Sequence, residues 1–339
     1  MATAQDSAGD SGGFRRELWR IVRQCLVAGL VCVLSFTGFS FVYNLVTEGA
    51  VPAPAGLTYV QTGNILTRYR EWGASGTPVL LLHGFVESAD TWAPTAEVLA
   101  RDHRVYAIDL DGYGYTQRVA PYDTAHLTSQ VLDFIKVMHL QRPIVVGHSS
   151  GAAVAAAVAL AAPDSVGGVM FLDGDALPLD GTANGGQDTS GTGIWLPQPY
   201  RTTLLRLVLR SDFAIRAIYT ETCGPRCPAL TEAGIEQWRR PFQVAGAEPA
   251  AFAVLSSGIP SVSVAGLHRL ALLPIPKSVV FGADDSEYPA GDAAQTAARI
   301  GAPAPTLIPG ARHLTLVSDP AAVAAAVQAL AVRAGDSSD

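Results

Sequence analysis

The sequence predicts an α/β fold in which a mostly parallel sheet is flanked by helices. From about Leu57 onward, short apolar and β-branched runs alternate with alanine-rich stretches of helical character, the pattern of strands covered by helices. The apolar runs are continuous, as in strands buried on both faces. The expected strands are 79–82, 105–108, 144–146, 169–172, 279–281 and 306–308, and the expected helices are 91–101, 124–139, 151–162 and 320–333.

The first element in chain order is a run of 24 residues, 24–47, that contains no charged side chain. At about 1.5 Å per residue, a helix of this length exceeds the roughly 30 Å hydrocarbon core of a bilayer. Four arginines within residues 15–23 precede it, whereas Glu48 is the only charge close to its other end. Because positive charges stay cytoplasmic, we expect a single-pass signal-anchor with the C-terminal domain on the non-cytoplasmic side.

A cleavable signal peptide is the alternative for this segment. Ala53-Pro54-Ala55 is a small-residue pattern of the kind found at cleavage sites. The hydrophobic run is longer than the 7–15 residues typical of such signals, which favours an uncleaved anchor. Cleavage would release the domain as a secreted protein.

The central part of the chain predicts an inserted subdomain. About a hundred residues separate the strands at 169–172 and 279–281, far more than a simple crossover needs. We therefore expect a cap over 177–265, beginning with a mobile Gly, Thr and Asp-rich loop at 181–193. Most aromatic residues of the cap should pack its own core, with one or two facing a substrate: Trp195, Tyr200, Phe213, Tyr219, Trp238, Phe242 and Phe252.

Two cysteines in the cap, Cys223 and Cys227, are close enough in sequence to be bridged. A non-cytoplasmic domain would permit a disulfide there, and two free thiols in a loop are the alternative. No Cys/His set has zinc-site spacing and no Walker-type loop is present. We expect neither a metal nor another cofactor.

The charge balance disfavours a nucleic-acid partner, because the net charge is −7 and no basic surface for a phosphate backbone is expected. Together these segments predict a cytoplasmic tail (1–23), a transmembrane anchor (24–47), a linker (48–56), the first part of the core (57–176), the cap (177–265) and the second part of the core (266–335).

One motif predicts a nucleophile. Gly147-His148-Ser149-Ser150-Gly151 directly follows the strand at 144–146 and precedes the alanine-rich helix. A strained strand-to-helix turn needs small flanking residues, and it leaves the serine hydroxyl exposed above the sheet. Ser149 is therefore the candidate nucleophile.

Four further motifs follow strands in a consistent order. They are His83-Gly84-Phe85, Asp109-Leu110-Asp111-Gly112-Tyr113-Gly114, Gly282-Ala283-Asp284-Asp285 and Pro309-Gly310-Ala311-Arg312-His313. From about Leu57 to Ala334 the chain resembles the α/β-hydrolase superfamily, in its serine esterase/lipase-like branch with a cap. Asp111 departs from the family pattern, in which proline is commoner. The resemblance implies an α/β-hydrolase fold with a helical cap inserted before the next-to-last strand.

The resemblance also implies roles for individual residues. A serine needs an imidazole to take its proton and later protonate the leaving group, and His313 matches that position. Asp285 best matches the carboxylate that orients the imidazole, and its neighbour Asp284 stays open. Asp173 and Asp175, after the preceding strand, are further alternatives.

The backbone amides of Phe85 and Ser150 are expected to form the oxyanion hole. The activity implied is hydrolysis of carboxylic esters through an acyl-serine intermediate, on a small ester with an apolar group. A C–C bond hydrolase or acyltransferase with the same triad is an alternative, as is a silent ligand-binding protein. An aspartate at position 149 would have indicated epoxide hydrolase or dehalogenase chemistry.

Overall fold

The structure is a computed structural model that describes residues 11–178, 197–288 and 290–336. The predicted mobile loop at 181–193 and Trp195 lie outside the described residues. The chain forms two compact units, one of Met1–Gly49 with Ile194–Leu207 and the other of Ala50–Gly193 with Val208–Asp339.

The first unit is built on one long helix, α1 (Ser11–Val46). By length and composition, Gly13–Val46 is able to cross a membrane, with a mean hydropathy of 2.2 in its most apolar window, and a signal sequence passes the same test. The predicted span at 24–47 lies in this helix except for its last residue. The helix begins earlier than the predicted span because the arginine-rich stretch before it consists largely of good helix formers.

Most of α5 (Tyr200–Leu209) also belongs to the first unit. The Tyr200 ring stacks on Phe36 of α1 at a centroid distance of 5.5 Å. The Arg206 guanidinium donates a hydrogen bond of 2.7 Å to the carbonyl of Asn44. Through these contacts α5, which lies in the predicted cap, packs on α1 within the first unit.

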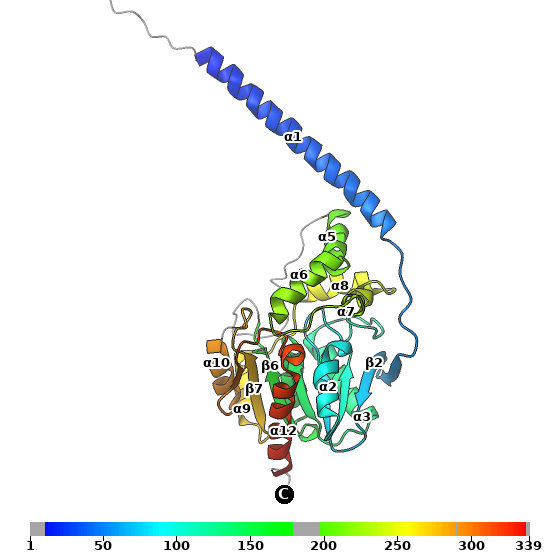
Figure 1. Cartoon of the computed structure of the whole chain (residues 1–339), viewed down its shortest axis with the longest axis vertical. Helices are drawn as coiled ribbons and strands as arrows, with labels where there is room; N and C mark the ends of the chain where they lie inside the picture. The colour runs from blue at the N-terminus through cyan, green and yellow to red at the C-terminus, as the bar shows by residue number, and fades with distance from the viewer. Residues whose placement is uncertain (1–10, 179–196, 289, 337–339) are drawn as a thin grey trace, which may run out of the picture. The chain divides into compact units, whose positions relative to one another are not determined.

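The second unit contains an eight-stranded sheet in the order β1-β2-β4-β3-β5-β6-β7-β8 (Figure 1). The first two strands pair antiparallel at one edge and the others run parallel. The strands are β1 (Thr58–Thr62), β2 (Ile65–Trp72), β3 (Thr77–Leu82), β4 (His103–Ile108), β5 (Ile144–His148), β6 (Gly168–Leu172), β7 (Lys277–Gly282) and β8 (Thr306–Ile308). Each of the six predicted strands lies within one of the parallel strands.

The antiparallel edge strands β1 and β2 were not predicted. In β2 the exposed Leu66 lies between the buried Ile65 and Thr67, and in β1 every residue but the last is exposed or half-buried. Strands with one solvated face lack the continuous apolar run of a fully buried strand, which was the signal used for the other six.

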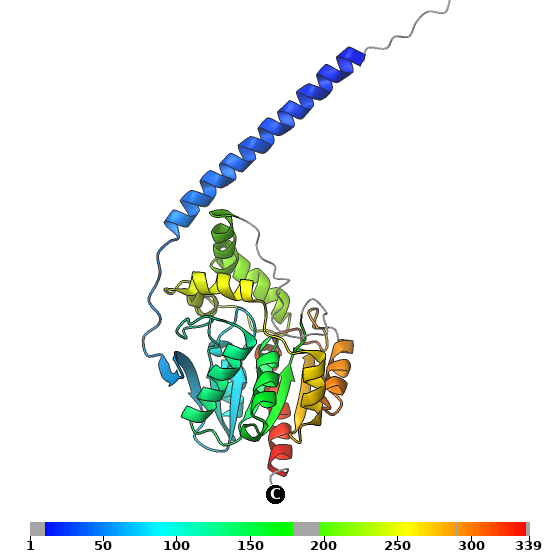
Figure 2. The same cartoon turned by 180° about the vertical axis from the view of Figure 1, so that it is seen from behind.

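Helices cover both faces of the sheet. One core cluster lies under α3, α4, α9 and α10, which Figure 2 shows in front of the sheet. The other lies under α2 and α12, in front of the sheet in Figure 1. The bounds of these helices are α2 (Ala93–Leu99), α3 (Thr124–Val137), α4 (Gly151–Ala161), α9 (Val264–Leu272), α10 (Ala290–Ile300) and α12 (Pro320–Asp336), and the short helical segments beside them are η1 (Ala89–Trp92), η2 (Pro163–Ser165) and α11 (Thr315–Ser318). Helices α9 and α10 were not among the predicted helices.

The remaining helices lie between β6 and β7, where an insertion was predicted. They are α6 (Asp212–Cys223), α7 (Glu232–Arg239), η3 (Arg240–Phe242) and α8 (Ala247–Ser257). The predicted linker at 48–56 is hydrogen-bonded to this cap, because the Val51 amide donates to Gln243 and the Arg240 side chain donates to the carbonyl of Pro52. This part of the linker is therefore fixed on the second unit.

Candidate active site

The candidate site lies at the carboxyl ends of the parallel strands. Ser149 follows β5, Asp285 follows β7 and His313 follows β8, and the loop carrying Phe85 follows β3. Loops after parallel strands meet at the same edge of a sheet, which is where α/β folds place their ligands. The sheet order therefore brings together residues that are far apart in sequence.

Ser149 occupies a strained turn between β5 and α4. Its φ of 51° lies in the left-handed region that non-glycine residues seldom adopt, and its amide donates a hydrogen bond of 2.9 Å to the carbonyl of Leu172. The flanking glycines are required sterically. A Cβ at Gly147 would lie 2.2 Å from the Gly151 carbonyl oxygen, and one at Gly151 would lie 2.6 Å from that of Leu82.

His313 is bonded to a buried carboxylate. Its Nδ1 lies 2.9 Å from Oδ2 of Asp285, whose side chain is fully buried. The other carboxylate oxygen accepts hydrogen bonds from the amides of Glu287, at 2.8 Å, and Tyr288, at 3.2 Å. Because both oxygens have partners, the carboxylate orientation is fixed and the imidazole is aligned with it.

The alternative acids occupy other environments. Asp284 is exposed, whereas Asp285 is buried. Asp173 accepts hydrogen bonds from the last amide of β7 and from a threonine hydroxyl two residues beyond His313. Asp175 accepts a hydrogen bond from the amide two residues further along its own loop. Of these four carboxylates, Asp285 is the one hydrogen-bonded to His313.

The environment of His313 favours its protonated form. Burial lowers the pKa of this imidazole, but the hydrogen bond and charge of Asp285 and the nearby Glu287 carboxylate raise the pKa above its ordinary value. The Glu287 Oε2 atom lies 3.5 Å from Nε2 on the pocket side. The Tyr288 ring stacks against the imidazole at 5.8 Å with an interplanar angle of 16°.

The loop after β3 passes directly against the serine. A Cβ at Gly84 would lie 2.9 Å from the Cβ of Ser149. His83 fixes this loop because its Nδ1 lies 2.8 Å from the Gly84 carbonyl oxygen and its Nε2 lies 3.0 Å from the Leu110 amide nitrogen. The Leu110 amide is a donor, so Nε2 accepts and Nδ1 donates. This neutral form agrees with a pKa that burial lowers.

The two expected oxyanion donors, Phe85 and Ser150, directly follow the two residues that make this contact, Gly84 and Ser149. Phe85 lines the cavity beside Ser149, and Ser150 directly precedes α4. In the turns and loops that the structure describes, neither the Phe85 amide nor the Ser150 amide donates to a backbone carbonyl. Both amides therefore remain available as donors to a ligand.

A buried ion pair behind the serine was not predicted. Oε1 of Glu87 lies 2.8 Å from Nδ1 of His148, and both side chains are almost fully buried. Nε2 of His148 lies 2.9 Å from the carbonyl oxygen of His313. Burial lowers the pKa of His148, but the charge of Glu87 raises it to about 9. The resulting imidazolium supports the backbone that carries His313.

His148 was expected beside the nucleophile, but neither its partner nor a role for Glu87 was predicted. The available signal was an acidic residue two positions after Phe85, in a loop expected to lie against the nucleophile. A carboxylate in such a buried position requires a charged or hydrogen-bonding partner.

A cavity of about 210 Å³ opens over the site, and both Ser149 and His313 line it. Its wall is mostly apolar and comes largely from the cap: Val208, Leu209, Ile215, Ile218, Tyr219, Trp238 and Phe242. Three of the cap aromatics line this cavity: Tyr219, Trp238 and Phe242. Phe213 instead is 82% exposed.

The described residues contain no group of three or more His, Cys, Asp and Glu side chains arranged to hold a metal ion. The ionisable groups beside Ser149 are instead engaged in the contacts with His313 and His148 described above.

The chain is similar to known proteins in sequence and in fold. The model of a family described as the alpha/beta hydrolase family matches residues 79–326. The chain is 32% identical over 162 residues to epoxide hydrolase 2 of Caenorhabditis elegans, an alignment that covers 44% of this chain and 46% of that protein. It is 32% identical over 98 residues to a pimeloyl-[acyl-carrier protein] methyl ester esterase of Aliivibrio salmonicida, which covers 29% of this chain and 36% of that protein.

The alignments thus span less than half the length of these relatives. Among solved structures, a thermophilic esterase from Thermogutta terrifontis superposes with a TM-score of 0.62 at 23% identity. The match covers 83% of this chain and 99% of the esterase. At this identity the likeness concerns the fold.

Proposed function

Because the chain belongs to the alpha/beta hydrolase family, we propose that it is a serine hydrolase that cleaves carboxylic esters through Ser149, His313 and Asp285. The observation that carries this proposal is the position of His313. One ring nitrogen is bonded to the buried Asp285, and the residue lines the same cavity as Ser149. A serine, an imidazole and a buried carboxylate are the three groups that acyl transfer by this route requires.

In the first step, Nε2 of His313 takes the proton of the Ser149 hydroxyl while Oγ attacks the ester carbonyl carbon. Asp285 keeps the proton of the imidazole on Nδ1, so that Nε2 is free to act as the base. The bond between Nδ1 and Oδ2, 2.9 Å long, also stabilises the imidazolium that forms. The raised pKa of His313 favours this proton uptake.

The negative charge on the carbonyl oxygen needs donors that are already oriented. The amides of Phe85 and Ser150 are proposed for this role, a contribution of roughly 3 kcal/mol per donor. His313 then gives its proton to the leaving alcohol, and an acyl group remains on Ser149. A water molecule activated by the same imidazole releases the acid and regenerates the serine.

Ester hydrolysis is favoured over the epoxide hydrolase activity in the name of the Caenorhabditis elegans relative. Residue 149 is serine in this chain, whereas that chemistry is associated with an aspartate nucleophile. The Aliivibrio salmonicida relative is named as a methyl ester esterase, which agrees with serine-based acyl transfer. The mostly apolar cavity favours a substrate whose acyl or alcohol group is apolar.

We further propose that α1 anchors the enzyme in a membrane and that the catalytic domain is non-cytoplasmic. The charge-free run at 24–47 and the arginines before it support this orientation. The disulfide between Cys223 and Cys227 is in keeping with an oxidising compartment.

The proposal is tested with purified full-length protein in detergent and a panel of esters of graded acyl length. Ser149→Ala should lower hydrolysis by at least ~10⁴-fold without altering the circular dichroism spectrum, because the three groups act as a unit. A folded Ser149→Ala variant that retains wild-type turnover would exclude the proposed mechanism.

The proposed preference for an apolar substrate is tested by comparing substitutions of two residues on α6. Ile218 lines the cavity, whereas Phe213 on the same helix is not among its lining residues. Each methylene that enters the cavity should raise kcat/KM up to ~4-fold, from about 0.8 kcal/mol of burial. Ile218→Ser should weaken this dependence on acyl length and Phe213→Ser should not. Equal effects of the two substitutions would remove the assignment of this wall to the acyl group.

A further inference from the structure

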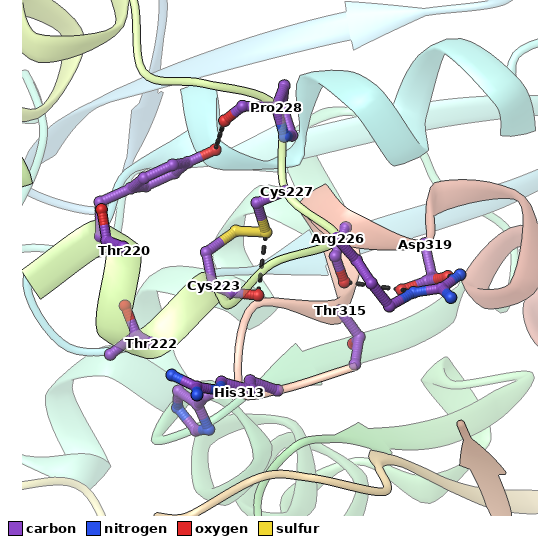
Figure 3. Close-up of a disulfide and its surroundings, with 12 residues drawn as sticks. Thr220, Thr222, Cys223, Arg226, Cys227, Pro228, His313, Thr315 and Asp319 are labelled. Carbon is purple, nitrogen blue, oxygen red and sulfur yellow. Dashed lines mark hydrogen bonds and ion pairs between the residues drawn. A yellow bond between two sulfur atoms is a disulfide. The ribbon is translucent and has the colours of Figure 1, made fainter. Parts of the chain in front are cut away.

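The disulfide of the cap lies against the segment that carries His313. Cys223 ends α6, and its bond to Cys227 closes a short loop (Figure 3). We use the name disulfide loop for residues 221–227 and histidine loop for residues 309–319. The two loops are distant in sequence, and their contacts are made in the middle of the histidine loop, at Arg312 and His313, and at its C-terminal end, Asp319.

The first contact involves the backbone of His313 itself. Its amide donates a hydrogen bond of 3.0 Å to the carbonyl of Thr222, the residue before Cys223. The neighbouring Arg312 guanidinium donates one of 2.8 Å to the carbonyl of Glu221. The disulfide loop therefore fixes the peptide on the N-terminal side of the proposed catalytic imidazole.

The second contact fixes the C-terminal end of the histidine loop. Arg226, which lies between the two cysteines, makes a bidentate ion pair with Asp319, in which Nε lies 3.0 Å from Oδ2. The Asp319 side chain is 7% exposed, and Asp319 directly precedes α12. Burial raises the pKa of this carboxyl, but the Arg226 guanidinium lowers it below its ordinary value.

The disulfide loop also passes closely over Arg312 of the histidine loop. A Cβ at Gly224 would lie 2.8 Å from Cδ of Arg312, and Gly224 has a φ of 77°. Cys223 is buried to 1% exposure in the core cluster that contains Leu314. The path of the loop is therefore set by the bridge, by the glycine and by the burial of Cys223 in this core cluster.

The disulfide loop bonds to the histidine loop through two backbone carbonyls and the long Arg226 side chain. The positions of these groups depend on the path of the backbone, which the bridge restrains. Without it, residues 223–227 gain conformational freedom, so the Arg226–Asp319 pair must form at the expense of that entropy, and the end of α6 at Thr222 loses a covalent restraint. A displacement of about 1 Å in a catalytic group lowers turnover by up to ~10²-fold. His148 of the Glu87–His148 pair is hydrogen-bonded to the carbonyl of His313. The amide of His313 is hydrogen-bonded to the disulfide loop.

We propose that the Cys223–Cys227 disulfide and Arg226 are positioning elements for His313, so that turnover depends on the oxidised state of the cap. This inference rests on the proposed role of His313 as catalytic base. It assigns the bridge a role in the reaction beyond stabilising the cap, because Cys223 directly follows Thr222, whose carbonyl bonds to the residue proposed to move the proton.

The test compares the oxidised and reduced full-length protein. A dithiothreitol thiolate attacks the half-exposed Cys227 sulfur and Cys223 leaves as a thiolate. The reagent supplies two electrons and two protons, yields two cysteine thiols and becomes a cyclic disulfide. Four quantities are measured in both states: hydrogen exchange of the His313 amide, kcat and KM for an ester, and the rate of labelling by a fluorophosphonate.

On reduction, exchange of the His313 amide should become at least tenfold faster. The kcat and the labelling rate should fall about tenfold or more, while KM changes less than twofold. The Cys223→Ser/Cys227→Ser variant should behave like the reduced protein and be insensitive to dithiothreitol. Arg226→Ala should show part of the loss. Arg216→Ala is the matched control, because it removes an exposed ion pair with Glu232 within the cap.

Unchanged exchange of the His313 amide after complete reduction would overturn the inference, whatever the activity. Equal losses of kcat in Arg216→Ala and Arg226→Ala would also overturn it, since general loosening of the cap would then account for the effect. If the oxidised protein neither hydrolyses esters nor reacts with the fluorophosphonate, the proposed function fails. The exchange measurement still decides whether the disulfide loop orders the histidine loop. The wild-type protein provides this result even if the double serine variant does not fold.

Discussion

His313 and Asp285 are joined by a hydrogen bond of 2.9 Å although they lie in loops that follow two different strands. These strands, β7 and β8, are parallel neighbours, with Gly282 opposite Ile308. The register therefore places the turn after one strand against the loop after the other. The second carboxylate oxygen accepts hydrogen bonds from the amides of Glu287 and Tyr288. The orientation of the carboxylate toward His313 is therefore fixed by the backbone of its own loop.

The first prediction concerns this acid. Asp285→Asn should lower kcat/KM by roughly 10²- to 10⁴-fold, because the asparagine amide cannot stabilise the imidazolium or fix its tautomer as the carboxylate does. Asp284→Asn, the exposed neighbour, should stay within a factor of about three. Ester hydrolysis by both variants under the same conditions provides the comparison, and the reverse order of effects would move the acid to position 284.

The second prediction is the pH dependence of turnover. Since the pKa of His313 is raised, its imidazole becomes available as a base only above the ordinary histidine range. The kcat/KM should rise with pH and have its midpoint above ~6.5. In Asp285→Asn the residual activity should have a lower midpoint. A wild-type midpoint below the ordinary value would contradict this environment for His313.

The third prediction concerns stability and the Glu87–His148 pair. The pKa of His148 is raised from 6.5 to about 9 in the folded chain. The contribution of His148 to the free energy of unfolding is fully present below the pKa of histidine in the unfolded chain. It is lost as pH rises through the pKa in the folded chain, a change of roughly 3 kcal/mol. Urea unfolding followed by tryptophan fluorescence should therefore show falling stability across this range.

The control for this measurement is Glu87→Gln/His148→Gln, which removes both charges of the pair. The double variant should lack the part of the pH dependence that comes from His148. The same decline in the wild-type protein and the double variant would mean that other groups cause it.

The fourth prediction concerns topology. Protease added to intact cells should digest the catalytic domain and spare the N-terminal tail, because the arginines before residues 24–47 favour a cytoplasmic N-terminus. A mature N-terminus near Gly56 would identify the segment as a cleaved signal. Protection of the domain inside the cell would contradict the orientation and leave the site assignments untouched, since they depend on other residues.

The parallel part of the fold was predictable because its signals are local. Buried parallel strands appear as continuous apolar runs, and a strand, a small-residue turn and an alanine-rich helix mark the position of Ser149. The edge strands β1 and β2 have a solvated face, so their pattern is weaker. Their place in the sheet depends on pairing with β4, which no local pattern specifies.

The supporting contacts of the site could not be predicted from sequence patterns. The bond between the Thr222 carbonyl and the His313 amide joins two backbones, and backbone groups carry no sequence signal. The pairing of Glu87 with His148 requires the loop after β3 to approach β5, which follows from the sheet order. The contacts of α5 with α1 likewise arise only in the folded chain.

The most direct test of the central claim is covalent labelling of the full-length wild-type protein with a fluorophosphonate, followed by peptide mass spectrometry and an ester hydrolysis assay on the same sample. The account predicts a single adduct on Ser149 and a loss of hydrolysis in proportion to the labelled fraction, with no labelling in His313→Ala on the same timescale. Full hydrolytic activity in protein whose Ser149 is completely labelled, or an adduct on another residue that alone accounts for the loss, would contradict it.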